Sequence, residues 1–413
     1  MLVGGMILLG KEQAYPGWRA LVPVGGTLLV MEAGRGAWVN RKVLSHPAVV
    51  WVGLISYPLY LFHWPALSFV HIVKGEAPKA GYVWAALAVA LLLTLATYYL
   101  VEKPLRHNRS RWVLPSLIAA FLACALSGVL IWKGTIQSRP VPAEMTKIPE
   151  AVHDRDMLDR WTWVSPAGAK VLLYKAGGDG PQTLVLGDSN AQQYAPRIYE
   201  LIKGNQPQQR GVLYVTAGGT PPIPGVMNPK VDGCRDMLPT FQEILSKDPR
   251  IDRVVIAAWW HGYLCKDSEY RMNGTSLGDS VARGSALKSL EDFIRDLKRK
   301  GKQVILVTSI PTGRMLDPKY LHARGFLGLY PQKAKGYSKQ QFLDANHGFV
   351  QDIGFAGQRA GARVVDPLDF LCDAQGMCVA EDSGGVPIRY DPFHLRPGYV
   401  REHVKYLDFT VEP

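Results

Sequence analysis

The feature that most constrains this chain is a set of long, nearly uncharged apolar stretches within its first 132 residues. A helix needs about 20 apolar residues to cross a bilayer. Three stretches meet this length and two shorter ones indicate further spans: 47–73, 80–101 and 112–132, then 1–9 and 21–31. None has the charged start and small-residue cleavage site of a signal peptide, so we expect residues 1–132 to remain as transmembrane helices.

Basic residues in the connecting loops predict the orientation of these spans. Loop 102–111 carries four basic residues and loop 34–46 carries three, whereas in loop 74–80 two lysines are offset by Glu76. Basic loops tend to stay in the cytoplasm. The last span then delivers residue 133 onward to the opposite face, which in a Gram-negative cell is the periplasm. We therefore expect a multi-pass protein of the bacterial inner membrane, in contact with its lipid.

The basic balance of the chain agrees with a membrane protein better than with a nucleic-acid partner. The formal net charge is +12, from 47 Lys and Arg against 35 Asp and Glu. No basic helix or aromatic-interleaved RNA motif accompanies it, so we expect no nucleic-acid binding. Four of the five cysteines lie after residue 132, which permits two disulfides in an oxidising compartment.

The rest of the chain reads as a connector followed by an α/β domain. Residues 133–180 contain four spaced prolines and end in a glycine-rich run, which is typical of a connector. After it, continuous apolar runs alternate with amphipathic stretches, and this pattern predicts a parallel sheet covered by helices on both faces, over 181–413. The predicted strands are 183–186, 211–216, 253–259, 303–309 and 362–366, and the predicted helices are 191–202, 238–245, 285–298 and 339–359.

A serine at the end of the first predicted strand is the sharpest local signal. The apolar run ends in Gly187-Asp188-Ser189, directly before a helix. Ligands favour the carboxyl edge of an α/β sheet, and the backbone N–H groups of a helix start can stabilise a developing oxyanion. The alternative is that Asp188 and Ser189 only cap the helix, because both residue types are preferred N-caps.

A second signal lies close to the end of the chain, where Asp391 precedes His394 by three residues. A serine nucleophile needs a base, and the base needs an orienting carboxylate. On one helical turn the two side chains would share a face, so that Asp391 holds His394 in the tautomer that accepts the Ser189 proton. The alternative is a surface Asp-Pro turn with an incidental histidine. Finding both signals in one α/β domain favours the triad.

These residues carry a family resemblance. Gly187-Asp-Ser189 and Asp391-x-x-His394-Leu resemble the first and last blocks of the SGNH (GDSL-like) hydrolase superfamily, which implies a three-layer α/β fold with Ser189 as nucleophile and oxyanion donor. The string Ile-Ser-Tyr-Pro-Leu-Tyr-Leu-Phe-His-Trp-Pro at 55–65 resembles the late transmembrane part of acyltransferase-3 proteins. The combination resembles bacterial O-acetylases of lipopolysaccharide O-antigen and other surface glycans.

The sequence departs from that family in two places. The family's membrane domain has about ten spans, with donor-handling motifs in the early ones, whereas this sequence begins at what resembles the last few. We expect either a fragment or a membrane half that no longer handles the donor, with a partner protein as one source of the missing spans. The family's third block has an oxyanion-donating Asn, but the strand here ends Ala-Ala-Trp-Trp-His at 257–261.

The resemblance also implies an oxyanion pair. Its second-block glycine corresponds to Gly218 or Gly219, so the N–H groups of Ser189 and Gly219 are the expected donors. It implies acetyl-CoA as the ultimate donor on the cytoplasmic side, with no cofactor or metal in the soluble domain.

The remaining candidates have structural alternatives. In the spans, His63 is a functional candidate because an ionisable residue inside an apolar span is one by default, but we favour a neutral histidine bonded to a neighbouring helix. We expect Cys124 to be a buried small apolar residue. The Trp259-Trp260 pair, which His261 follows, could stack on a sugar ring. For at least one of these two tryptophans we expect packing in the core instead. Cys372 and Cys378 predict a local disulfide that rigidifies the loop before Asp391; a metal site is the alternative. Cys234 and Cys265 are the remaining pair.

Together these observations predict an O-acyltransferase that moves an acyl group, acetyl by resemblance, through an acyl-serine onto a surface glycan. Ser189 would attack, His394 would take its proton and Asp391 would orient His394. One alternative is a periplasmic glycan acetyl-esterase, in which water accepts the acyl group on the same triad. The other is a glycan-binding module without catalytic activity.

Overall fold

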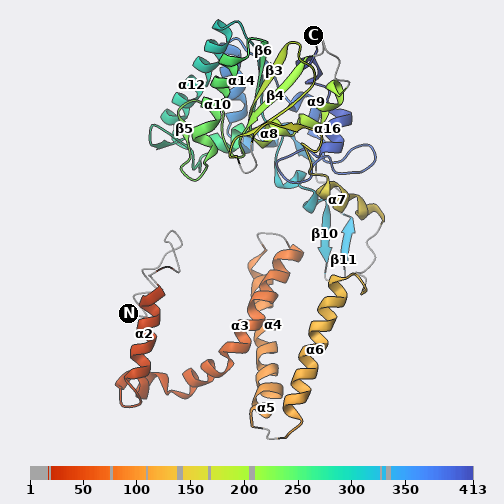
Figure 1. The fold of residues 1–413 in the computed structure, drawn as a ribbon. Helices are drawn as coiled ribbons and strands as arrows, with labels where there is room; N and C mark the ends of the chain where they lie inside the picture. Colours follow the sequence, from red (N-terminus) through yellow and green to blue (C-terminus); the bar gives the residue numbers. More distant parts are fainter. Residues whose placement is uncertain are drawn as a thin grey trace. The chain divides into compact units, whose positions relative to one another are not determined.

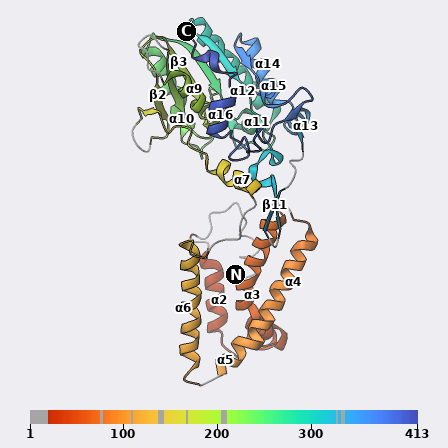
Figure 2. The same ribbon diagram turned by 90° about the vertical axis from the view of Figure 1, so that its right-hand side faces the viewer.

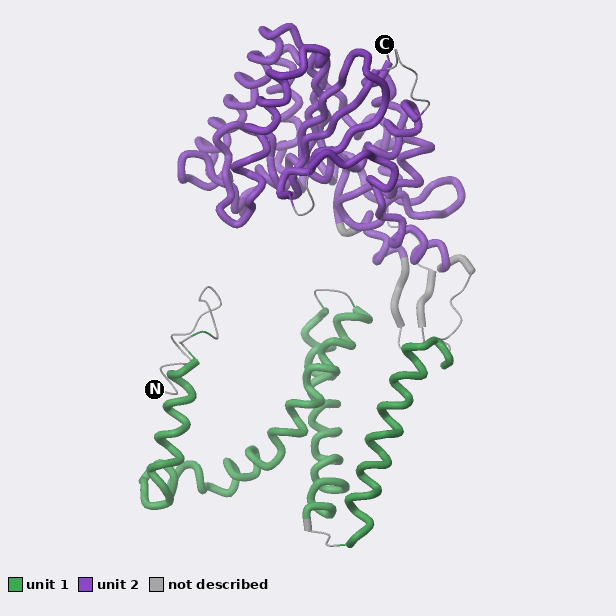
Figure 3. Tube along the Cα trace, in the orientation of Figure 1, with its two compact units in different colours: residues 1–139 green, residues 140–413 purple. Residues whose placement is uncertain are grey.

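A computed structural model describes most of the chain as two compact units, 1–139 and 140–413 (Figure 3). The residues described are 17, 20–74, 78–107, 110–136, 143–165, 169–203, 210–325, 328–331 and 336–412. The predicted span 1–9 lies outside the described residues.

The first unit is entirely helical in its described part. Helices α3 and α4 pack side by side (Figure 2), and α4 continues through a π-helical turn into α5. Its elements are α2 (Leu21–Glu32), η2 (Val39–Leu44), α3 (Pro47–Lys74), α4 (Ala80–Ala96), η3 (Thr97–Glu102), α5 (Lys103–His107) and α6 (Val113–Trp132). Two continuous helices, Ala80–Arg106 and Val113–Trp132, are long and apolar enough to cross a membrane. The predicted span 47–73 is helical as α3, but α3 does not meet that measure.

Two expectations about this unit were wrong in detail. Cys124 is exposed, because within the described helix α6 no residue is buried by the rest of the chain. Among the described residues His63 bonds its own helix and no neighbouring one, since its Nδ1 lies 2.8 Å from the carbonyl oxygen of Tyr60 and 3.2 Å from that of Leu59. An exposed apolar surface of this kind is costly in water and suits lipid.

The second unit is built on a seven-stranded sheet with the order β1-β2-β4-β3-β6-β9-β13 (Figure 1). The five strands from β4 to β13 run parallel and confirm the five predicted apolar runs. Their bounds are β3 (Gln182–Gly187), β4 (Gly211–Thr216), β6 (Ile251–Ala257), β9 (Gln303–Val307) and β13 (Arg363–Val365).

The sheet is mixed and not wholly parallel as predicted. Strand β2 (Leu172–Ala176) pairs antiparallel with β4, and β1 (Thr162–Trp163) pairs antiparallel with β2. Both strands lie within 133–180, so part of the stretch expected to be a connector joins the main sheet. Strand β4, the partner of β2, is distant in sequence, and the prolines and glycines of this stretch are local signals that do not report such a pairing.

Helices cover both faces of the sheet and enclose two apolar cores (Figure 1). One face carries α10 (Gly233–Lys247), α11 (Trp260–Leu264), α12 (Ser280–Arg299) and α14 (Phe349–Arg359). The other carries α8 (Ser189–Gln192), α9 (Ala195–Ile202) and α16 (Pro397–His403). The predicted helix 339–359 is divided into α13 (Lys339–Ala345) and α14, because His347 and Gly348 adopt positive φ angles.

Smaller elements complete the unit. They are α7 (Ala143–His153), β5 (Val226–Met227), β7 (Arg271–Met272), β8 (Thr275–Ser276), η4 (Arg314–Leu316), η5 (Pro318–Tyr320), β10 (His322–Gly325), β11 (Gly328–Pro331), β12 (Tyr337–Ser338), α15 (Leu368–Leu371), β14 (Met377–Cys378) and η6 (Asp408–Thr410).

Strand β3 ends at a residue that has no room for a side chain. Gly187 pairs with Ala257 of β6, and a Cβ at Gly187 would lie 1.8 Å from the Ala257 carbonyl oxygen. The backbone at Gly187 therefore lies in close contact with the backbone of β6. This contact sets the position from which residues 188 and 189 leave the sheet.

Candidate active site

Ser189 stands at the carboxyl end of a central strand. Asp188 is the N-cap of α8, and its Oδ1 accepts the Asn190 backbone N–H at 2.7 Å. Ser189 is the first residue of this four-residue helix and is half-buried. The capping role expected for this motif thus belongs to Asp188, which leaves the Ser189 hydroxyl for other interactions.

The structure brings Ser189, His394 and Asp391 together. His394 Nε2 lies 2.8 Å from Ser189 Oγ, and His394 Nδ1 lies 2.9 Å and 3.0 Å from the two carboxylate oxygens of Asp391. A carboxylate only accepts hydrogen bonds, so the Nδ1–H donates to Asp391 and Nε2 is left to accept the Ser189 proton. This is the tautomer that a serine nucleophile requires.

The local conformation that joins Asp391 to His394 differs from the predicted helical turn. Residues 391–393 form bends, and no residue of 391–394 is helical. Asp391 Oδ1 accepts the backbone N–H groups of Phe393 and His394, each at 2.8 Å. The physical reason is Pro392, since the residue before a proline is disfavoured in the helical region. The Asp391 carboxylate therefore stabilises the turn through its backbone N–H groups and also orients the His394 imidazole.

Electrostatics keep Asp391 ionised. Partial burial of the carboxyl acts to raise its pKa, but the hydrogen bond and charge of His394, with the two backbone N–H donors, outweigh burial and lower the pKa. Asp391 therefore carries its charge throughout the neutral range and can stabilise an imidazolium at His394.

Two side chains that sequence reasoning missed fix the histidine segment. Gln193 Oε1 accepts the Leu395 backbone N–H at 3.0 Å, and its Nε2 donates to the Asn190 carbonyl oxygen at 3.0 Å, so it joins this segment to α8. Arg389 is fully buried and donates to the carbonyl oxygens of Pro311 and Val379 at 2.9 Å and 3.0 Å. No local motif marks either residue, because Gln193 contacts Leu395 and Arg389 contacts Pro311, both remote in sequence.

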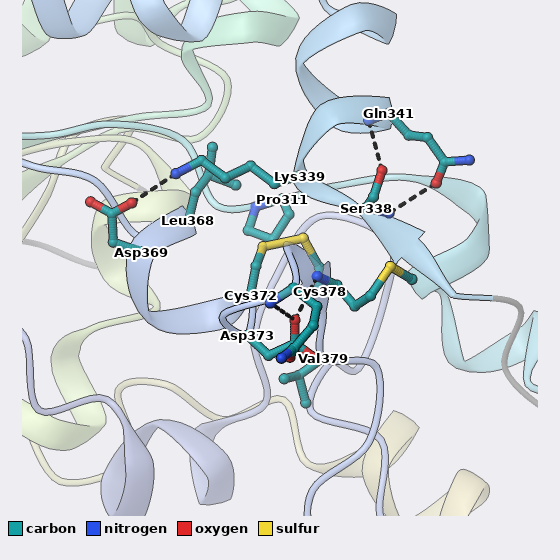
Figure 4. The surroundings of a disulfide bond; sticks show 12 residues. Pro311, Ser338, Lys339, Gln341, Leu368, Asp369, Cys372, Asp373, Cys378 and Val379 are labelled. Carbon is teal, nitrogen blue, oxygen red and sulfur yellow. Dashed lines mark hydrogen bonds and ion pairs between the residues drawn. A yellow bond between two sulfur atoms is a disulfide. The ribbon is translucent and has the colours of Figure 1, made fainter.

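The predicted disulfide between Cys372 and Cys378 is confirmed (Figure 4). The next residue, Val379, donates its backbone N–H to the Leu371 carbonyl oxygen, and its own carbonyl oxygen accepts from Arg389. Arg389 therefore connects the disulfide-bridged loop to the segment that carries His394. Among the described residues Cys234 and Cys265 are free thiols, and the second bridge that the cysteine count permits does not form between them.

Asp188 joins the serine turn to the end of strand β6. Its carboxylate is buried and accepts the backbone N–H of Trp259 at 3.0 Å and the hydroxyl of Tyr263. Burial raises the pKa of Asp188, against the lowering effect of these donors. The motif identified Asp188 as a cap, but its role as a link between two strand ends depends on Tyr263, which the sequence did not single out.

Gly219, the expected second oxyanion donor, follows β4, the neighbour of β3 in the sheet. It has a φ of +66°, which favours glycine, and its carbonyl oxygen accepts the hydroxyl of Tyr270. Tyr270 in turn packs edge-on against Tyr263, with ring centroids 4.8 Å apart. The loop is thus held in place, while the oxyanion role of Ser189 and Gly219 stays a prediction.

The tryptophan pair has two different structural roles. Trp260 is fully buried and its indole N–H donates to the Val307 carbonyl oxygen at 2.8 Å, so it belongs to the core. Trp259 is half-buried and its indole N–H donates to His261 Nε2 at 2.9 Å. His261 Nε2 also lies 2.7 Å from Thr312 Oγ1. Only Trp259 is placed where a ligand could reach it.

Burial lowers the pKa of His261 to about 3, which predicts a pH-dependent stability. Between the ordinary value of about 6.5 and this lowered value, the unfolded chain binds a proton that the folded chain does not. The free energy of unfolding should therefore fall with decreasing pH in this window, by up to about 1.4 kcal/mol per pH unit. In His261→Gln, which retains an acceptor for Trp259, urea unfolding should show a shallower slope between pH 6.5 and 4.5. An unchanged slope would contradict this assignment.

Comparison with known proteins places these observations in a family. A family model described as "SGNH domain (fused to AT3 domains)" matches residues 156–401, more than half of the chain. A provisionally named O-acetyltransferase of Staphylococcus aureus strain COL is 31% identical over 99 residues, 23% of this chain and 16% of the relative. A provisionally named membrane-bound transacylase, BcsY of Komagataeibacter xylinus, is 26% identical over 108 residues, 25% of this chain and 26% of the relative.

The solved periplasmic domain of a lipopolysaccharide acetyltransferase from Salmonella ser. Paratyphi A matches with 13% identity and a TM-score of 0.42, covering 57% of this chain and 84% of that domain. The chain thus spans at most about a quarter of the length of the two curated relatives.

Proposed function

The chain belongs to the family of SGNH domains fused to AT3 domains, and from this premise we propose that it is a membrane-anchored O-acyltransferase that acylates a surface glycan. The observation that carries the proposal is the 2.8 Å contact between His394 Nε2 and Ser189 Oγ, with Asp391 on the other imidazole nitrogen. The names of the matched relatives, O-acetyltransferase and membrane-bound transacylase, support acetyl as the transferred group.

The reaction that this geometry supports has two steps. Ser189 Oγ attacks the acyl carbonyl carbon while His394 Nε2 takes its proton, and the imidazolium then gives that proton to the leaving group as the acyl–donor bond breaks. In the second step a sugar hydroxyl loses its proton to His394 and attacks the acyl-serine, and the released Ser189 oxygen takes the proton back. The N–H groups of Ser189 and Gly219 would stabilise both tetrahedral oxyanions.

The proposal locates the reaction at a membrane. The two long apolar helices, Ala80–Arg106 and Val113–Trp132, support an anchor, and the basic loops support an inner membrane with the α/β unit in the periplasm. Acetyl-CoA would then be the ultimate donor on the cytoplasmic side.

The experiment supplies the acyl group directly. Full-length protein in detergent receives 4-nitrophenyl acetate with and without a panel of methyl pyranosides, and mass spectrometry detects acetylated sugar. We expect acetylated sugar to form and the rate of 4-nitrophenol release to rise with acceptor concentration. Release of acetate alone would indicate the esterase, and absence of both turnover and labelling by a fluorophosphonate would indicate a binding module without catalysis.

A further inference from the structure

A large aromatic side chain stands exposed directly beside the base of the triad. Phe393 immediately precedes His394, and 40% of its surface is exposed. Single exposed apolar residues need no explanation, but Phe393 belongs to a group of rings around the site. Tyr390 stacks on the His394 imidazole with centroids 5.4 Å apart and planes within 3°, and Phe393 contacts Trp259 edge-on at 5.0 Å.

The position of Phe393 is fixed on both sides. Its backbone N–H donates to Asp391 Oδ1 at 2.8 Å, so the same carboxylate that orients His394 also sets this residue. Its ring lies against Trp259, whose indole N–H is bonded to His261 and whose backbone N–H is bonded to Asp188. An exposed ring held in this way loses little conformational freedom when a ligand covers it.

The acceptor must come close to this ring. In the proposed reaction the sugar hydroxyl lies within hydrogen-bond reach of His394 Nε2, and the pyranose that carries the hydroxyl is only one bond further away. The ring of Phe393 contacts Trp259, whose backbone N–H donates to the carboxylate of Asp188, the residue before Ser189, so this ring borders the Ser189–His394 pair. A pyranose presents C–H groups on its faces, and these pack well against an aromatic face, whereas an acetyl group offers a single methyl.

We propose that Phe393, supported by Trp259, forms a sugar-binding subsite that stacks on the acceptor pyranose. This inference rests on the proposed function, since it assigns the acceptor side of the same site. Of the Trp259-Trp260 pair that could stack on a sugar, only Trp259 takes part, because Trp260 is fully buried in the core, the role expected for at least one of the two. Phe393 thus determines specificity by binding, and it takes no part in proton transfer.

The test compares two activities in the same variant. In Phe393→Ala, we expect the ratio of acetyl transfer to pyranosides over hydrolysis of 4-nitrophenyl acetate to fall about tenfold, through a higher KM for the sugar, the size expected for one lost stacking contact. Phe393→Trp should restore the ratio. Phe355→Ala, which removes a ring with 53% exposure on α14, is the matched control and should keep the wild-type ratio.

Each outcome decides a separate point. An unchanged ratio in Phe393→Ala overturns the subsite. The subsite is also overturned if the loss of activity depends on acyl chain length, measured with 4-nitrophenyl butyrate against acetate, and does not depend on the sugar. That result would assign the ring to the acyl side of the site. If the wild-type protein transfers acetyl to no pyranoside, the proposed function fails first, and the subsite fails with it.

Discussion

Replacing Ser189 with Ala should reduce acyl turnover by at least about 10³-fold while the α/β unit stays folded. The change removes the oxygen that lies 2.8 Å from His394 Nε2 and leaves the cap at Asp188 intact. Turnover of 4-nitrophenyl acetate by the full chain measures the effect. A fluorophosphonate probe should label the wild-type protein and not the variant.

Ser309→Ala is the matched control for this experiment. Ser309 is another serine just beyond a parallel strand; it is buried, and its hydroxyl has no hydrogen-bond partner among the described residues. Its loss should leave turnover within a few-fold of wild type. If Ser189→Ala retains most of its turnover, or if the probe still labels it, another nucleophile is responsible and the triad assignment is wrong.

Gly187→Ala should have the largest effect on stability. The new Cβ would lie 1.8 Å from the Ala257 carbonyl oxygen and 2.8 Å from the Ala191 Cβ, and a backbone atom cannot move aside as a side chain can. We expect the free energy of unfolding to fall by about 3 kcal/mol or more, or the protein to fail to accumulate. Pulse proteolysis of the full chain in urea measures the loss.

A second glycine provides the comparison. Gly284 is exposed within helix α12, and a Cβ there would meet nothing within 4 Å. Gly284→Ala should therefore stabilise the protein by roughly 0.5–1 kcal/mol, because alanine loses less backbone freedom in a helix. Equal stability of the two variants would show that β3 and β6 do not approach each other as closely as described.

Much of the fold could be predicted from the sequence because the central strands are continuous apolar runs, a pattern that a strand buried on both faces requires. The five runs from residue 183 to residue 366 are strands in the structure. Strands β1 and β2 escaped prediction, because β2 pairs antiparallel with β4, which is remote in sequence, and β1 is a two-residue edge strand paired with β2.

The residues of the candidate site could be predicted from the sequence, but the contacts that hold them in place could not. The strings around Ser189 and His394 are local, and so is the disulfide between Cys372 and Cys378, so their residue types and spacing could identify them. The contacts of Asp188 with Tyr263 and of Gln193 with Leu395 join residues far apart in the chain. Such contacts follow from the tertiary fold and leave no pattern in the sequence.

The two halves of the triad are anchored in different ways. Ser189 follows β3, which is paired with a parallel strand on each side. Asp391 and His394 lie in a segment without helix or strand, held by the buried Arg389, the side chain of Gln193 and the neighbouring bridged loop. Segments of this kind open locally at a lower free energy than a central strand. In the proposed reaction, opening of this one peripheral segment would separate His394 from Ser189 while the sheet stays intact.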